Sequence, residues 1–191
     1  MSSALSLVDR HTDATEKLIL VSALELLERA GVTELTVRAV AKHAGMSERT
    51  VFRYFASREE FLDAVAAEVV RNLRAPAPPA KIDDLPDYPR VLYARFEAKA
   101  DLVRSALHTE VFKRIHDTVA KERWQAARSL IDAHAGHRSD RDRKIAAANI
   151  RYYLAATTWH YYRFYFGFTL AETIDSARSA IRLTIGEILK R

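Results

Sequence analysis

The chain has 191 residues, of which 49% are hydrophobic and 29% are charged, and its formal net charge at pH 7 is +5. It contains no cysteine, which excludes a disulfide framework and thiolate metal sites. Its apolar runs are shorter than the roughly 18 residues that span a bilayer, and the start of the chain lacks a signal-peptide pattern. We therefore expect a cytoplasmic protein without a membrane partner.

The N-terminal part of the chain predicts four helices that follow a tail of residues 1–12. Apolar residues recur at helical spacing over residues 13–30, 37–44, 48–55 and 58–73, which together form a predicted domain of residues 13–75. Gly45 permits a tight turn between the second and third helices, so residues 36–55 predict a helix-turn-helix. No segment alternates long enough to predict a strand, and the predicted fold is all-α.

The third of these helices carries side chains suited to reading DNA. We expect Val51, Phe52 and Phe55 to point inward, and Arg49, Thr50 and Arg53 to point outward. Arginine can pair with two atoms of guanine, and threonine can contact thymine or phosphate. Thr36 and Ser47 stand at helix starts, where a hydroxyl caps the helix and free N–H groups suit a phosphate.

Prolines mark a boundary after the fourth helix. All five lie within residues 76–89, which predicts a proline-rich linker. Residues 90–191 predict a second helical domain, with helical patterns over 88–108, 109–135, 140–166 and 170–189. We expect one break near residues 99–101 and another before Glu122.

The run GMSERTVFRYFASREEFL, residues 45–62, resembles the second half of the helix-turn-helix of TetR-family transcriptional regulators. The similarity extends over about residues 13–73. Two positions depart from the family pattern, because Phe52 often corresponds to a tyrosine and Arg58 usually corresponds to a lysine. The resemblance implies base contacts from Arg49, Thr50 and Arg53, and DNA-backbone contacts from Thr36, Ser47, Tyr54 and Arg58.

The resemblance also implies a homodimer that reads an inverted repeat of double-stranded DNA, with residues 90–191 forming a helical effector-binding and dimerisation domain. Half of the aromatic residues lie between Tyr152 and Phe168, so this segment must be covered on more than one side. Ordinary core packing is the alternative for any single aromatic residue. Candidate residues of the dimer interface are Tyr161, Tyr165, Ile174, Ile181 and Ile185. Candidate residues of a pocket for an apolar or aromatic effector are Phe96, Arg104, His108, His116, Trp124, Tyr152, Tyr153 and Trp159.

The sequence offers little sign of catalysis. It has no Gly-rich phosphate loop, nucleophile elbow or zinc-protease motif, so we expect no enzyme, no cofactor and no metal. His134 and His137 have a metal-like spacing, but Gly136 between them indicates a helix end and surface histidines. The main hypothesis is a dimeric repressor that a small molecule releases from a palindromic operator. The alternatives are a helical small-molecule-binding protein with incidental DNA contact, or an activator of the same fold.

Overall fold

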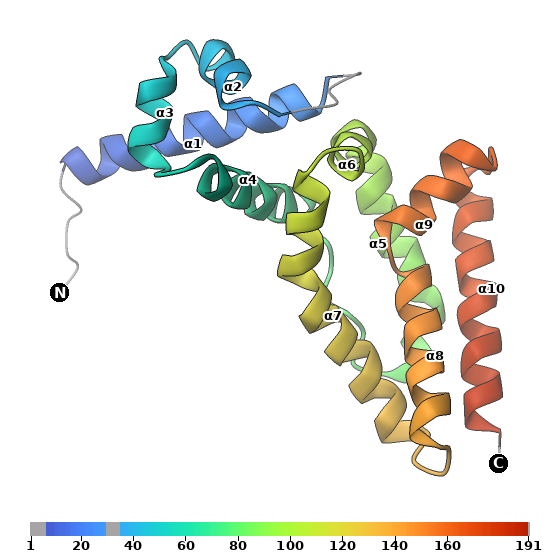
Figure 1. Cartoon of the computed structure of the whole chain (residues 1–191). Helices are drawn as coiled ribbons and strands as arrows, with labels where there is room; N and C mark the ends of the chain where they lie inside the picture. The colour runs from blue at the N-terminus through green and yellow to red at the C-terminus, as the bar shows by residue number, and fades with distance from the viewer. Residues whose placement is uncertain (1–6, 30–34, 191) are drawn as a thin grey trace. The chain divides into compact units, whose positions relative to one another are not determined.

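A computed structural model describes residues 7–29 and 35–190, with side chains from Ala14 onward. Every regular element within these residues is a helix, which confirms the predicted all-α class (Figure 1). The chain forms two compact units. The first unit contains Met1–Asn72 and Asp101–Ile115, and the second contains Leu73–Ala100 and His116–Arg191.

The first unit is built on α1 (Leu7–Leu27), α2 (Val37–His43), α3 (Glu48–Tyr54) and α4 (Arg58–Leu73). It also contains most of α6 (Ala100–Leu107) and the start of α7 (Val111–His134). Helices α2 and α3 pack on each other and on α1. The apolar core that they share consists mainly of Ile19, Ala23, Leu27, Leu35, Val40, Val51, Phe55, Phe61 and Leu62.

Helix α1 differs from its predicted limits. It begins at Leu7, before the predicted start at Asp13, and ends at Leu27. No glycine or proline lies between Leu7 and Asp13, so nothing interrupts the helix at the predicted cap. The predicted end at Ala30 lies outside the described residues.

The second unit begins with a 3₁₀ helix, η1 (Ile82–Asp87), followed by α5 (Tyr88–Ala98) and by α7 from His116 onward. It continues with α8 (Asp140–Tyr153), α9 (Ala156–His160), a π-helical turn η2 (Tyr161–Tyr165) and α10 (Leu170–Leu189). Helix α10 packs along α8 and against α5 and η1 (Figure 1). The core of this unit is formed mainly by Leu92, Tyr93, Phe96, Ile131, Ala147, Ile150, Trp159, Ala177 and Ile181.

The helix limits of the second unit confirm some predictions and correct others. Helix α10 has its predicted limits, and the chain breaks at Lys99 as expected. The break expected before Glu122 was wrong, because α7 is continuous and contains neither glycine nor proline. The helix predicted over residues 140–166 ends instead at Tyr153. There the Tyr93 hydroxyl donates to the Tyr153 carbonyl at 2.5 Å, which diverts an acceptor from the helical ladder.

Of the prolines predicted to form a linker, Pro76, Pro78 and Pro79 lie in a non-helical segment, whereas Pro86 and Pro89 lie in regular structure. Ile82, Leu85 and Pro86 of η1 are buried, and Pro89 stands in the first turn of α5, where a missing N–H costs nothing. The domain limits derived from these prolines stay a prediction. Among residues 7–29 and 35–190, no helix is long and apolar enough to cross a membrane.

Candidate nucleic-acid interface

The connection between α2 and α3 is a tight turn with a cap at each helix start. The Thr36 hydroxyl accepts a hydrogen bond from the Ala39 N–H at 3.1 Å, and the Ser47 hydroxyl accepts one from the Thr50 N–H at 3.2 Å. Gly45 has φ +69°, a left-handed conformation that favours glycine. The predicted turn and both predicted caps are therefore confirmed.

Packing holds α3 in place, because a helix of seven residues is not stable alone. Val51 is fully buried beneath it, and Ala41 of α2 is buried where the two helices meet. The His43 imidazole lies 2.7 Å from a Glu25 carboxylate oxygen and ties α2 to α1. The outer face of α3 is thus presented on a fixed support.

The outer face of α3 exposes Glu48, Arg49, Phe52 and Arg53. Phe52 was expected to point inward, but 44% of its surface is exposed. The physical reason is that Val51 and Phe55 already fill the inward stripe of a two-turn helix, which leaves Phe52 one turn after Glu48 on the outer side. Phe52 therefore joins Arg49 and Arg53 in one surface that combines two guanidinium groups with an apolar ring.

Thr50 is placed differently from the two arginines. Its side chain is partly buried, and its hydroxyl lies 2.9 Å from the Ser47 hydroxyl. This contact lies at the N-terminus of α3, which Ser47 caps, so the Thr50 hydroxyl has one hydrogen-bond partner within the protein.

Tyr54 connects α3 with α1. The Arg53 guanidinium lies 5.3 Å from the centre of the Tyr54 ring, within the range of a cation–π contact. A hydrogen bond to Thr15, and then one to Arg53, lowers the pKa of the Tyr54 hydroxyl. A contact with a DNA phosphate would therefore have to be made alongside these two partners.

Arg58, at the start of α4, is already engaged by a carboxylate of the same unit. Its guanidinium donates to both oxygens of Glu110, one of them at 2.9 Å. The hydrogen bond from Arg58 holds the pKa of Glu110 below its usual value. Arg114 is bound nearby in the same manner, to Glu59 and Asp63 of α4. A phosphate would have to compete with Glu110 for Arg58.

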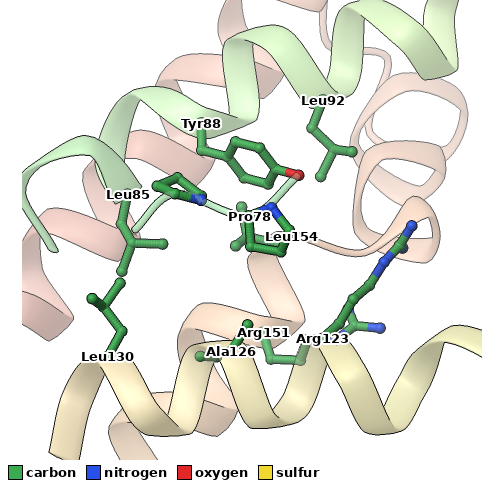
Figure 2. A pocket seen from close by; sticks show the side chains of 11 residues that line it. Pro78, Leu85, Tyr88, Leu92, Arg123, Ala126, Leu130, Arg151 and Leu154 are labelled. Carbon is green, nitrogen blue, oxygen red and sulfur yellow. The ribbon is translucent and has the colours of Figure 1, made fainter. Parts of the chain in front are cut away.

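The second unit contains a cavity of about 30 Å³, bounded by η1, α5, α7, α8 and the segment that precedes η1 (Figure 2). Its lining residues are Pro78, Pro79, Leu85, Tyr88, Leu92, Arg123, Ala126, Ala127, Leu130, Arg151 and Leu154. None of the eight predicted effector residues, all of which are described, is among them. The sequence analysis did not consider Arg123 and Arg151, which lie near small and apolar residues of α7 and α8 and line this cavity.

The predicted effector residues occupy other places. Phe96 and Trp159 are buried against each other with ring centres 5.8 Å apart, while Tyr152 is exposed. Tyr153 is partly buried, and its ring packs edge-on against that of Tyr152. Arg104 and His108 belong to the first unit, whereas His116 and Trp124 lie on the part of α7 in the second. Their role in binding an effector stays a prediction.

The candidate dimer residues divide between core and surface. Ile181 is fully buried within its own unit, and Ile174 and Ile185 are partly buried, whereas Tyr161 and Tyr165 are exposed. Two apolar residues that the sequence reasoning missed are exposed in a groove between α8 and α10, Ile145 and Leu183, the latter at 73%. Both residues lie outside the buried stripe of their helices, and an apolar residue at such a position predicts an exposed apolar surface.

The described part of the chain has no group of three or more side chains placed to bind a metal. His134 and His137 are exposed, and each faces a backbone carbonyl, of Leu130 and Lys190 respectively.

The helix-turn-helix region is similar to known bacterial regulatory proteins. Residues 19–65 match the family model described as "Bacterial regulatory proteins, tetR family", which confirms the resemblance read from residues 45–62. No curated protein matches the chain in sequence.

Solved structures with a similar fold span nearly the whole chain. The crystal structure of BioQ has a TM-score of 0.54 and 21% identity over 90% of this chain and 96% of that one. BioQ of Mycobacterium smegmatis has a TM-score of 0.52 and 21% identity over 90% and 95%. A TetR transcriptional regulator from Rhodococcus sp. RHA1 has a TM-score of 0.51 and 18% identity over 93% and 99%. At these identities the likeness concerns the fold.

Proposed function

We propose that this chain is a homodimeric repressor that a small molecule releases from a palindromic operator. The proposal builds on the match to the tetR family of bacterial regulatory proteins, which are DNA-binding transcriptional regulators. The observation that carries the proposal is the outer face of α3. Arg49 and Arg53 are exposed one helical turn apart, on a capped helix whose inner face is buried. Among the described residues no carboxylate pairs with either guanidinium, so both can donate to guanine edges or phosphates.

Phe52 adds an apolar surface beside these two arginines. A ring exposed at this place loses contact with water when it meets a thymine methyl group or the apolar edge of a sugar. The face therefore has the two components of groove recognition, charged donors and an apolar contact. Since a helix of seven residues reads few base pairs, a second copy is needed for specificity.

The groove between α8 and α10 supports the homodimer. Leu183 and Ile145 would lose their contact with water if the same surface of a second copy covered them. The polar residues around them in the groove include Arg138, Asp142 and Glu187, which suit the rim of an interface.

The cavity of the second unit supports control by a small molecule. It lies between η1, α5, α7, α8 and the segment that precedes η1, and most of its lining residues are apolar. An effector that binds better to a DNA-incompetent arrangement than to the competent one reduces the population bound to operator.

The direct experiment is selection of genomic fragments by the purified protein, followed by sequencing of the fragments that remain bound. We expect an inverted repeat whose half-sites are centred about one helical turn of DNA or a multiple apart. Placing the recovered sequence upstream of a reporter then tests the direction of control: a repressor lowers expression, whereas an activator raises it. Failure to enrich any sequence would overturn the proposal.

A further inference from the structure

The cavity of the second unit has one charged side and one apolar side. In Figure 2, Leu85 and Leu130 lie together on one side, and Arg123 lies on the other, with Arg151 beside it. No acidic residue lines the cavity. Tyr88 also faces it, but its hydroxyl already donates to the Pro76 carbonyl at 2.5 Å. The two guanidinium groups are therefore the donors that a ligand would meet.

This arginine pair is unusual for the unit that contains it. The other partly buried arginines of the unit have acceptors among the described residues. Arg128 and Arg143 pair with Asp132, Arg163 pairs with Glu97, and Arg178 pairs with Asp87. Arg138 donates to the backbone carbonyls of Ile188 and Glu187. Among the described residues, neither Arg123 nor Arg151 has an ion pair or a side-chain hydrogen bond. Burial lowers the pKa of the Arg151 guanidinium, and the positive charge of Arg123 lowers it further. Within the described part of the chain, two like charges thus lie near each other without a carboxylate partner, an arrangement that costs stability.

We propose that this cavity binds an organic monoanion, a carboxylate carried on an apolar body, with Arg123 and Arg151 holding the carboxylate and the leucine side holding the body. The assignment of this ligand as the effector rests on the proposed function, whereas its binding does not.

The chemistry of the walls selects this class over others. A neutral apolar molecule would leave both arginines desolvated and unpaired, and a cation would be repelled. Inorganic phosphate would satisfy the arginines but would use none of the apolar surface. A carboxylate accepts two parallel N–H bonds from one guanidinium, and its second pair of acceptor positions can serve the other arginine.

The cavity must widen to admit such a ligand, because about 30 Å³ holds roughly one or two water molecules. One wall is made by Pro78 and Pro79, which lie in the non-helical segment between α4 and η1. The hydrogen bond from Tyr88 to Pro76 fastens this segment, whereas the remaining walls belong to helices. The proline segment is therefore the wall that moves.

The test uses octanoate, octanol and octylamine, which share one apolar chain and differ in head-group charge. Calorimetry with the full chain, in a buffer free of phosphate and carboxylates, measures their dissociation constants. We expect octanoate to bind about ten to a hundred times more tightly than octanol, and octylamine to bind most weakly. Arg123→Gln and Arg151→Gln should each reduce the preference for octanoate by about tenfold or more. Arg90→Gln is the matched control, because Arg90 is exposed on α5 and does not line the cavity.

Equal affinity for the three probes, no detectable octanoate binding, or octanoate binding that neither Gln variant weakens would overturn the proposal. Thermal unfolding of each variant separates lost binding from lost folding, and the two arginine variants serve as independent checks. These measurements contain no DNA. If the protein binds octanoate but enriches no genomic sequence, the proposed function is refuted and the ligand class stands. If it enriches an operator but does not bind octanoate, the ligand class is refuted and the proposed function stands.

Discussion

Two pairs of arginines, one in each unit, differ in the solvent around them. Arg49 and Arg53 are exposed on the outer face of α3, where water already stabilises both charges. Arg123 and Arg151 line a cavity, where Arg151 is partly buried and its pKa is lowered. A charged side chain that stays in water hardly changes the stability of the fold. A charged side chain that is withdrawn from water lowers the stability unless a bound ligand of opposite charge offsets the lost hydration. The first pair therefore suits a polyanion that approaches from solvent, and the second suits a small anion that enters.

The strongest test of this comparison replaces the exposed pair. Arg49→Ala with Arg53→Ala should lower operator affinity by about 2–6 kcal/mol, because each bidentate base contact contributes about 1–3 kcal/mol. Fluorescence anisotropy with the selected operator measures the loss. The unfolding free energy should change by less than about 0.5 kcal/mol per site, since both side chains are exposed.

The matched control is Arg90→Ala with Arg95→Ala, which removes two exposed arginines from α5 and leaves α3 unchanged. It lowers the net charge equally, so an equal loss of operator affinity would mean that total charge, and not the α3 face, drives binding.

Disrupting the proposed dimer should lower operator affinity, because a dimer presents Arg49 and Arg53 to both half-sites whereas a monomer presents them to one. Leu183→Asp places a charge at the most exposed apolar position of the α8–α10 groove. We expect a monomer in light scattering and a loss of operator affinity of tenfold or more, because each copy then binds a half-site alone. Since Leu183 is 73% exposed, the fold of the subunit should persist in circular dichroism. If the variant remains dimeric, the dimer interface does not include the α8–α10 groove.

The cavity pair should show the opposite effect on stability. Arg151→Met removes a partly buried charge without a carboxylate partner and should raise the unfolding free energy by up to about 1 kcal/mol, with solvent screening limiting the gain. Arg49→Met, on the exposed face, should leave it nearly unchanged. Urea unfolding of the two variants compares them directly. Destabilisation by Arg151→Met would indicate that this arginine supports the fold.

The smallest expected effect concerns Arg58, an arginine that already has a carboxylate partner. Glu110→Gln should weaken the hold on the Arg58 guanidinium, which Glu59 also approaches at 3.9 Å, and strengthen operator binding by about 0.2–1 kcal/mol, with a steeper salt dependence. Because Arg58 lowers the pKa of Glu110, the ion pair is fully formed above the ordinary value of 4.5 and is lost as the pH falls through the lowered pKa. Anisotropy at pH 7 over a salt series measures the change. Unchanged affinity and salt slope would show that Arg58 does not contact DNA.

The first unit was largely predictable because its signals are local. Thr36 and Ser47 each bond to an N–H three residues later, and Gly45 supplies the positive φ that the turn needs. Such contacts depend on neighbours in the chain, so a short pattern specifies them. The predicted direction of Phe52 was wrong because Val51 and Phe55 already fill the inward side of α3, and the sequence pattern does not show how much space the core has.

The second unit was less predictable because distant residues decide its details. The Tyr93 hydroxyl, 60 residues from its acceptor, bonds to the Tyr153 carbonyl where α8 ends. Trp159 was proposed for a pocket, yet its ring is fully buried and its indole N–H donates to Glu97 at 3.0 Å, beside Arg163. An aromatic residue reads the same in a sequence whether it faces a core, a cavity or solvent.

The sequence by itself determined the all-α class, the helix-turn-helix and its resemblance to the tetR family, because helical periodicity, caps and a turn glycine act within a few residues of each other. Only the tertiary structure decided which arginines have carboxylate partners, which apolar residues stay exposed and where the cavity lies. Those properties depend on side chains brought together from distant parts of the chain, and one sequence carries no record of such distances.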